Sequence, residues 1–89
     1  MWRIILIFSD GDRQVPTIVK LGNIAIRMFA NDHNPPHFHI AIPGRQIAIT
    51  IDGFAILAGS IDRKSLTTAL EWAAKNRGRL NDEWNRLNP

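Results

Sequence analysis

Three dipeptides with strong turn preferences divide the middle of this 89-residue chain into short segments of similar length. Gly22-Asn23, Pro43-Gly44 and Asp52-Gly53 each suit the two-residue loop of a β-hairpin. The segments between them are rich in isoleucine, which favours strands, so the spacing predicts an antiparallel meander of five strands. The expected strands are Thr17–Leu21, Ile24–Ala30, His37–Ile42, Arg45–Ile51 and Phe54–Ser60.

Helical spacing replaces this pattern after Ile61. Asp62 can cap the N-terminus of a helix, and Gly78 is placed to end that helix as the residue after its C-cap. A second short amphipathic helix is expected to follow. The apolar residues that share one face are Leu66, Leu70 and Ala73 in the first helix, and Leu80, Trp84 and Leu87 in the second.

Strands followed by helices predict an α+β fold, an antiparallel β-meander of five to six strands with two C-terminal helices packed on one face. The length predicts a single domain over residues 1–89, with the sheet in 15–61 and the helices in 62–88. Residues 1–14 are expected to be either an N-terminal extension or an extra strand, because the apolar residues of Trp2–Phe8 alternate.

The composition restricts the chemistry and the location of the protein. The absence of cysteine excludes disulfide bonds and thiolate chemistry. A small fold without disulfides fits a reducing cytosol, so we expect a cytoplasmic protein. No apolar stretch approaches the length of a membrane span, so no membrane association is expected. The net charge of +3 fits an anionic partner such as RNA, and it fits simple solubility equally well.

Two-residue loops fix the pairing of the flanking strands, and this pairing sorts their side chains into two faces. The expected pairs are Ile40 with Ile47, Phe38 with Ile49, Ile49 with Ile56, and Ile51 with Phe54. The apolar face that should carry the helices consists of Phe38, Ile40, Ile42, Ile47, Ile49, Ile51, Phe54 and Ile56. The opposite face should hold His37, His39, Ala41, Gln46, Ala48, Thr50, Ala55, Leu57 and Gly59.

The segment Asp32–His39, DHNPPHFH, contains all three histidines of the chain beside an aspartate. His37 and His39 are two residues apart on the expected strand, so both point from one face, with Cα atoms about 6.5–7 Å apart. That spacing allows two imidazoles to converge on one metal ion. Pro35 and Pro36 stiffen the connection to the strand, which lowers the entropy lost when the loop binds a ligand.

Two chemical roles are open for this segment. In the first, His33, His37 and His39 bind a divalent metal such as zinc, manganese or iron. Asp32 is then the fourth ligand, or it orients the histidines. In the second, two of the histidines act as general acid and base on a phosphodiester, and Arg27 stabilises the phosphate. Arg27 is expected on the histidine face because it alternates with the core residues of its strand.

Two other interpretations of the segment involve no chemistry. The histidine face can be a binding surface for RNA or for a protein. Alternatively, Asp32 and Asn34 cap a turn, the two prolines shape it, and the histidines are partly exposed strand residues.

The C-terminal part is rich in basic side chains and contains two tryptophans. A phosphate-binding patch is one interpretation of the basic residues, but we favour the solvated faces of two helices. Trp84 is in register with Leu80 and Leu87 and is expected in the core, whereas Trp72 is expected at a rim. The basic residues are Arg63, Lys64, Lys75, Arg77, Arg79 and Arg86.

The motif DHNPPHFH resembles the signature DHNPPHxHV of a family of small bacterial proteins catalogued as a domain of unknown function. The position after the last histidine is Ile40 here. The family usually begins near Met-Pro-Thr-Ile, which implies that Val15 corresponds to a GTG start codon and that residues 1–14 are an extension. The likeness extends over most of the chain and includes Val15-Pro16-Thr17-Ile18, Gly59, Glu71-Trp72, Leu80 and Trp84.

Members of the resembled family are often encoded beside a second small uncharacterised domain, an arrangement similar to a two-gene toxin–antitoxin module. The resemblance therefore implies a small partner protein from a neighbouring gene, with RNA as a candidate target. It implies no catalytic role, and whether the protein is an enzyme stays open, as does its oligomeric state. The leading hypothesis is one component of such a module that acts through His33, His37 and His39. The alternatives are a ribonuclease, either metal-dependent or of the histidine acid/base type, and an accessory domain with a structural metal ion.

Overall fold

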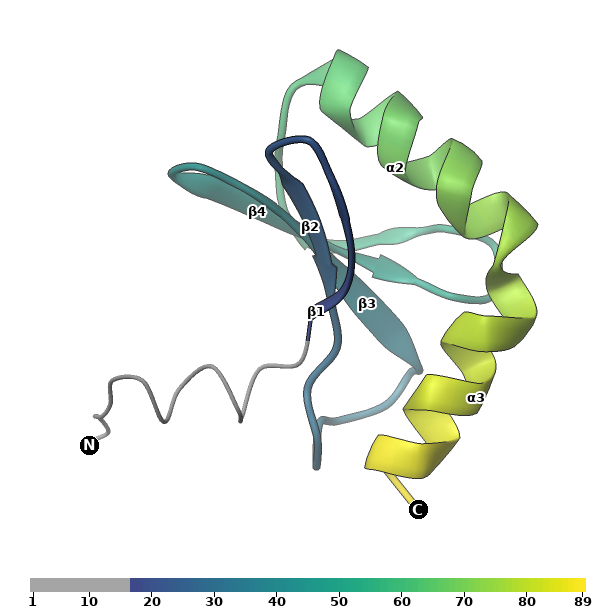
Figure 1. Cartoon of the computed structure of the whole chain (residues 1–89). Coiled ribbons are helices and arrows are strands. Elements are labelled where there is room, and N and C mark those ends of the chain that lie inside the picture. The colour runs from purple at the N-terminus through teal and green to yellow at the C-terminus, as the bar shows by residue number, and fades with distance from the viewer. Residues whose placement is uncertain (1–16) are drawn as a thin grey trace.

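The computed structural model describes residues 17–89, which form one sheet and two helices (Figure 1). Both helices lie along one side of the antiparallel sheet, whose strand order is β1-β2-β3-β4-β5, and this confirms the predicted α+β fold. No helix among these residues is long and apolar enough to cross a membrane. The strand predicted at Trp2–Phe8 lies outside the described residues. The elements are β1 (Thr17–Leu21), β2 (Ile24–Arg27), β3 (His37–Ile42), β4 (Arg45–Thr50), β5 (Ile56–Gly59), α2 (Arg63–Lys75) and α3 (Arg77–Leu87).

Two of the three predicted hairpins have the expected two-residue loops. Strands β1 and β2 meet at Gly22-Asn23, and β3 and β4 meet at Pro43-Gly44. Gly44 has a φ of 79°, which glycine adopts without a steric penalty. The predicted pairs of Ile40 with Ile47 and of Phe38 with Ile49 are present, and the same register pairs His39 with Ala48 and His37 with Thr50.

The third hairpin, between β4 and β5, is not the predicted two-residue loop. Ile51 does not pair with Phe54, because its N–H donates to the carbonyl of Pro36 at 3.1 Å. Thr50 closes the loop instead. Its N–H donates to the carbonyl of Ala55, and its hydroxyl accepts the N–H of Ala55, each at 2.9 Å. A side-chain hydroxyl thus replaces a backbone acceptor, which lengthens the loop and delays the start of β5.

A register shift in β5 changes which of its side chains are exposed. Ile49 pairs with Ile56 and Ala48 pairs with Ala58, which leaves Leu57 as the extra residue of a bulge. Ile56 is 61% exposed, so its predicted place in the apolar core face is wrong.

The hydrophobic core lies between the sheet and the helices. Trp84 is buried there, as predicted, and Trp72 is only partly buried at the edge of the core. The sheet contributes Ile24, Ile26, Met28, Phe38, Ile40, Ile47, Ile49 and Ile51, and the helices contribute Ala69, Ala73, Leu80 and Trp84.

The junction between the helices differs from the prediction at Gly78. The predicted N-cap of α2 is present, since Oδ2 of Asp62 accepts the N–H of Ser65 at 2.9 Å. At the other end, Nδ2 of Asn76 donates to the carbonyl of Trp72 at 2.8 Å. Asn76 therefore terminates α2 by satisfying one of its free carbonyls, and Gly78 lies in the first turn of α3.

Two arginines of α3 attach the helices to the sheet. Nε of Arg77 donates to the carbonyl of Ile51 at 3.0 Å, and its guanidinium lies 4.2 Å from the ring centroid of Phe54. Nη2 of Arg79 donates to the carbonyl of Ile18 at 3.2 Å. These contacts give the two residues a structural role, which disfavours a phosphate-binding patch on this helix.

Candidate metal centre

The connection between β2 and β3 is held by the end of α3. The N–H of Asp32 donates to Oδ1 of Asn88 at 2.6 Å, and Nδ2 of Asn88 donates to the carbonyl of Phe29 at 3.3 Å. The N–H of Asn31 donates to the carbonyl of Leu87 at 3.3 Å. A distant helix end therefore fixes the position of Asp32. Nothing in the sequence marks Asn88 as part of a site.

The structure gathers the three histidines around the carboxylate of Asp32. Nε2 of His37 lies 2.9 Å from Oδ2 of Asp32, and Nε2 of His39 lies 3.8 Å from the same oxygen. Nε2 of His33 lies 3.7 Å from Oδ1, which also accepts the N–H of His33 at 2.8 Å. Nε2 of each histidine therefore lies within 3.8 Å of the carboxylate. His39 does not join the group of described residues whose ligand atoms all lie within 4.8 Å of one another, which consists of Asp32, His33 and His37.

Two of the imidazole rings are oriented by backbone carbonyls. Nδ1 of His37 lies 2.7 Å from the carbonyl oxygen of Pro35, and Nδ1 of His33 lies 3.2 Å from that of Asn34. A carbonyl oxygen can only accept a hydrogen bond, so each Nδ1 carries the proton. Nε2 of both rings is then the atom directed at Asp32. Histidine ligands of metal ions are usually held in this way, with the second ring nitrogen donating to a carbonyl or a carboxylate.

His37 is an interior residue and not a partly exposed strand residue. Its side chain is 2% exposed. The ring lies between the ring of His33 and the indole of Trp84, with centroids 5.2 Å away on each side. The histidine end of the sheet is therefore packed against α3.

His39 has a buried polar atom without a partner. Its Nε2 is inaccessible to solvent and has no hydrogen-bond partner among residues 17–89. The ring meets that of Phe29 edge-on, at a centroid distance of 4.6 Å. Burial, with a smaller contribution from the neighbouring His37, lowers the pKa of His39. The lowered pKa favours the neutral ring, in which one nitrogen has a lone pair for a ligand.

The donor set fits a divalent transition metal. Imidazole nitrogens with one carboxylate oxygen are ligands typical of zinc, manganese and iron sites. Ligand atoms of a tetrahedral zinc ion lie about 3.3 Å from each other, given zinc–ligand distances near 2.0–2.1 Å. The distances from the carboxylate to the three Nε2 atoms, 2.9, 3.7 and 3.8 Å, bracket this value. The potential ligand atoms of Asp32, His33 and His37 all lie within 4.8 Å of one another.

One side of the cluster is open to solvent. The side chain of His33 is 79% exposed. A polar hollow of about 360 Å³ lies next to Asp32, so a ligand from solution can reach this carboxylate. Its lining residues are Asn31, Asp32, Asn34, Trp84, Asn88 and Pro89.

Arg27, the cation predicted on the histidine face, lies beside His39. The two residues are directly paired across β2 and β3. Paired residues point to the same face of a sheet. No ion pair among residues 17–89 joins Arg27 to Asp32, so Arg27 adjoins the cluster and does not form part of it.

A family model described as a domain of unknown function (DUF4160) matches residues 23–85. The match includes Asp32 and the three histidines. No curated protein and no solved structure matches the chain.

Proposed function

The chain belongs to the DUF4160 family, and we propose that it binds one divalent transition-metal ion through Asp32, His33, His37 and His39. The observation that carries the proposal is the orientation of His37. Its Nδ1 donates to the carbonyl of Pro35, and its buried Nε2 faces a carboxylate oxygen at 2.9 Å. A proton or a metal ion must lie between these two atoms, because two lone pairs repel each other at that distance.

A proton on His37 alone explains less of the cluster than a metal ion does. An imidazolium–carboxylate pair would account for the contact of His37 with Asp32. It would leave Nε2 of His39 buried and unpaired, which costs about 1–3 kcal/mol. One metal ion next to Asp32 would give both nitrogens a partner, and His33 would close the site from the solvent side.

The same contacts disfavour metal-free acid/base catalysis by His37. Both of its ring nitrogens are engaged, and its side chain is almost fully buried. A general acid or base must come within hydrogen-bond distance of its substrate. The side chain of His33 is 79% exposed, so the second histidine of this mechanism would have to act from a largely buried position.

Metal content tests the proposal. Tag-free protein is supplemented with zinc, manganese or iron, dialysed, and measured by elemental analysis beside His39→Ala and His37→Gln variants. We expect near-stoichiometric metal in the wild type and a strong loss in both variants. Circular dichroism checks that the variants are folded. Folded wild-type protein that retains none of the three metals would overturn the proposal.

The metal ion can be structural or catalytic, and chelation separates these roles. A structural ion stabilises the native state, because binding only to that state favours folding. We expect EDTA to lower the melting temperature of the metal-loaded protein if the ion is structural. A metal-dependent ribonuclease, the other hypothesis that involves an ion, predicts RNA cleavage that EDTA abolishes and that zinc or manganese restores.

A role in a two-gene toxin–antitoxin-like module is supported by the resemblance at DHNPPHFH and stays a prediction. It implies a partner protein encoded beside this gene, and a cytoplasmic location. Co-expression with the neighbouring gene product tests it, because a stable pair should co-purify. If this chain is the toxic component, its expression alone should arrest growth, and His39→Ala should relieve the arrest.

A further inference from the structure

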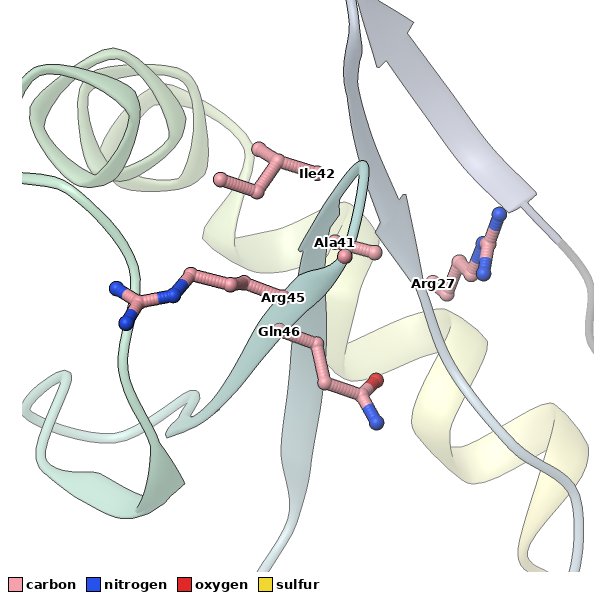
Figure 2. A pocket seen from close by; sticks show the side chains of 6 residues that line it. Arg27, Ala41, Ile42, Arg45 and Gln46 are labelled. Atoms are coloured by element: carbon pink, nitrogen blue, oxygen red, sulfur yellow. The ribbon is translucent and has the colours of Figure 1, made fainter.

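The sheet face beside the metal centre has an unusual combination of large polar and small apolar side chains. Arg27 pairs with His39, and Ala41 pairs with Gln46. Residues 39 and 41 are two apart on β3, so their side chains share a face with Arg27 and Gln46. The short side chain of Ala41 therefore lies between the long polar side chains of Arg27 and Gln46, as Figure 2 shows.

An open hollow of about 320 Å³ lies over Ala41. Arg45 contributes to its rim, but its side chain points away from Gln46 (Figure 2). No carboxylate of residues 17–89 lines the hollow, and the charged residues that line it are Arg27 and Arg45. The lining residues are Arg27, Ala41, Ile42, Gly44, Arg45 and Gln46.

A smaller hollow lies on the same face, next to His39. It has a volume of about 150 Å³ and is lined by His39, Gln46, Ala48, Ala58 and Gly59. Gln46 borders both hollows. The two hollows therefore adjoin on the face that Arg27 shares with His39, one of the proposed metal ligands.

Arg27 has unused hydrogen-bonding capacity. Its Nε is inaccessible to solvent and has no acceptor among residues 17–89. A guanidinium presents five N–H donors and binds planar or tetrahedral oxyanions through two of them at once. A buried donor without an acceptor is unfavourable. Because this Nε is inaccessible, an anion in the open hollow would bind the terminal nitrogens of the guanidinium.

We propose that Arg27 and Gln46 form an anion subsite of the proposed metal centre, and that the ligand of this centre carries a phosphate group. The inference rests on the proposed function, because the metal ion would be the third partner of the anion. A terminal phosphate offers three oxygens: one for the guanidinium, one for the amide, and one as a fifth ligand of the metal ion beside its four protein ligands. A carboxylate offers two oxygens and would leave one of these partners unused.

The spacing of the strands agrees with one small anion between the two sites. Directly paired residues on neighbouring strands have Cβ atoms about 4.5–5.5 Å apart. The side chains of Arg27 and His39, one of the proposed metal ligands, therefore start side by side on the same face of the sheet.

Titration with inorganic phosphate tests the subsite. Isothermal calorimetry is done with metal-free protein and with zinc-loaded protein, for the wild type, Arg27→Ala, Gln46→Ala and the control Arg63→Ala. Arg63 is exposed at the start of α2, so its replacement removes the same charge far from the hollow. We expect Arg27→Ala to weaken phosphate binding at least about tenfold, because it removes a charge-assisted hydrogen bond. The control should bind phosphate as the wild type does.

The outcomes separate this inference from the metal proposal. Equal phosphate affinities of Arg27→Ala and Arg63→Ala would overturn the subsite, whatever the metal content. Zinc content is measured on the same samples and judges the metal centre independently. Tighter phosphate binding by zinc-loaded than by metal-free wild type would support the shared ligand, and equal binding would refute it. Arg27→Gln, which keeps a polar side chain, repeats the test if Arg27→Ala does not fold.

Discussion

Nε2 of His37 lies 2.9 Å from Oδ2 of Asp32, inside a contact that solvent barely reaches. Asp32 lies within the β2–β3 connection, and His37 is the first residue of β3. The carbonyl of Pro35 holds the ring of His37, and the amide of Asn88 holds the backbone of Asp32. The pair is therefore rigid before any ligand binds, which is the property that a metal site requires of its ligands.

Removing the charge of Asp32 should weaken metal binding while the fold is kept. Asp32→Asn retains an oxygen that can accept the N–H of His33, but it is neutral and a poor ligand for zinc. We expect zinc affinity to fall at least about tenfold, measured by competition with a chromogenic chelator. Asp82→Asn makes the same chemical change at an exposed site on α3 and should have no effect. Equal zinc affinities of the two variants would exclude Asp32 as a ligand.

Asn88 should matter for both stability and metal affinity. Its side chain accepts from Asp32 and donates to the carbonyls of Phe29 and Trp84. Asn88→Ala removes the side-chain partner of the N–H of Asp32 and of the carbonyl of Phe29, whereas the carbonyl of Trp84 keeps the backbone N–H of residue 88. We therefore expect a loss of about 1–3 kcal/mol in the free energy of unfolding. Zinc affinity should fall about 10–100-fold, as for other residues that orient metal ligands.

The matched control for Asn88 is Asn85→Ala, one turn earlier on the exposed side of α3. It should change the unfolding free energy by less than about 0.5 kcal/mol. Urea denaturation measures both variants. An Asn88→Ala protein as stable as Asn85→Ala, with unchanged zinc affinity, would show that α3 does not position the loop.

The two tryptophans of the helices should differ in their contribution to stability. Trp84 is 5% exposed and contacts His37, whereas Trp72 is only partly buried. Trp84→Ala should lower the unfolding free energy by about 3–5 kcal/mol, and Trp72→Ala by less than about 2 kcal/mol. Thermal and urea denaturation measure the difference. Similar losses in the two variants would contradict the packing described for α3.

Two glycine-to-alanine substitutions should have opposite effects on stability. Gly59 has a φ of 81°, and a Cβ there would overlap the carbonyl of Gln46. Gly59→Ala should therefore cost more than about 1 kcal/mol. Gly78 lies in α3 with no atom near its added Cβ, so Gly78→Ala should stabilise the protein by about 0.5 kcal/mol. Melting temperatures that shift in the same direction would contradict the positive φ described for Gly59 or the helical position described for Gly78.

Several features of the fold follow from local sequence alone. Gly22-Asn23 and Pro43-Gly44 determine two hairpins, because few residue pairs can adopt the backbone angles of a two-residue loop. The second hairpin then fixes the pairing of β3 with β4, and the alternation of side chains fixes the core face. Asp52-Gly53 has equal turn preference, yet the hydroxyl of Thr50 and the carbonyl of Pro36 take the hydrogen bonds that a two-residue loop would use.

The sequence by itself determined that Asp32, His33, His37 and His39 lie within eight consecutive residues, which limits their separation to at most about 25 Å. The tertiary structure alone decided how they are arranged. Trp84 buries His37, and Asn88 reaches Asp32 from 56 positions away in the chain. Turn preference and alternation act between neighbours and can be read from local sequence. Burial and hydrogen bonds between distant segments depend on which surfaces meet when α3 packs on the sheet, and no local pattern encodes that choice.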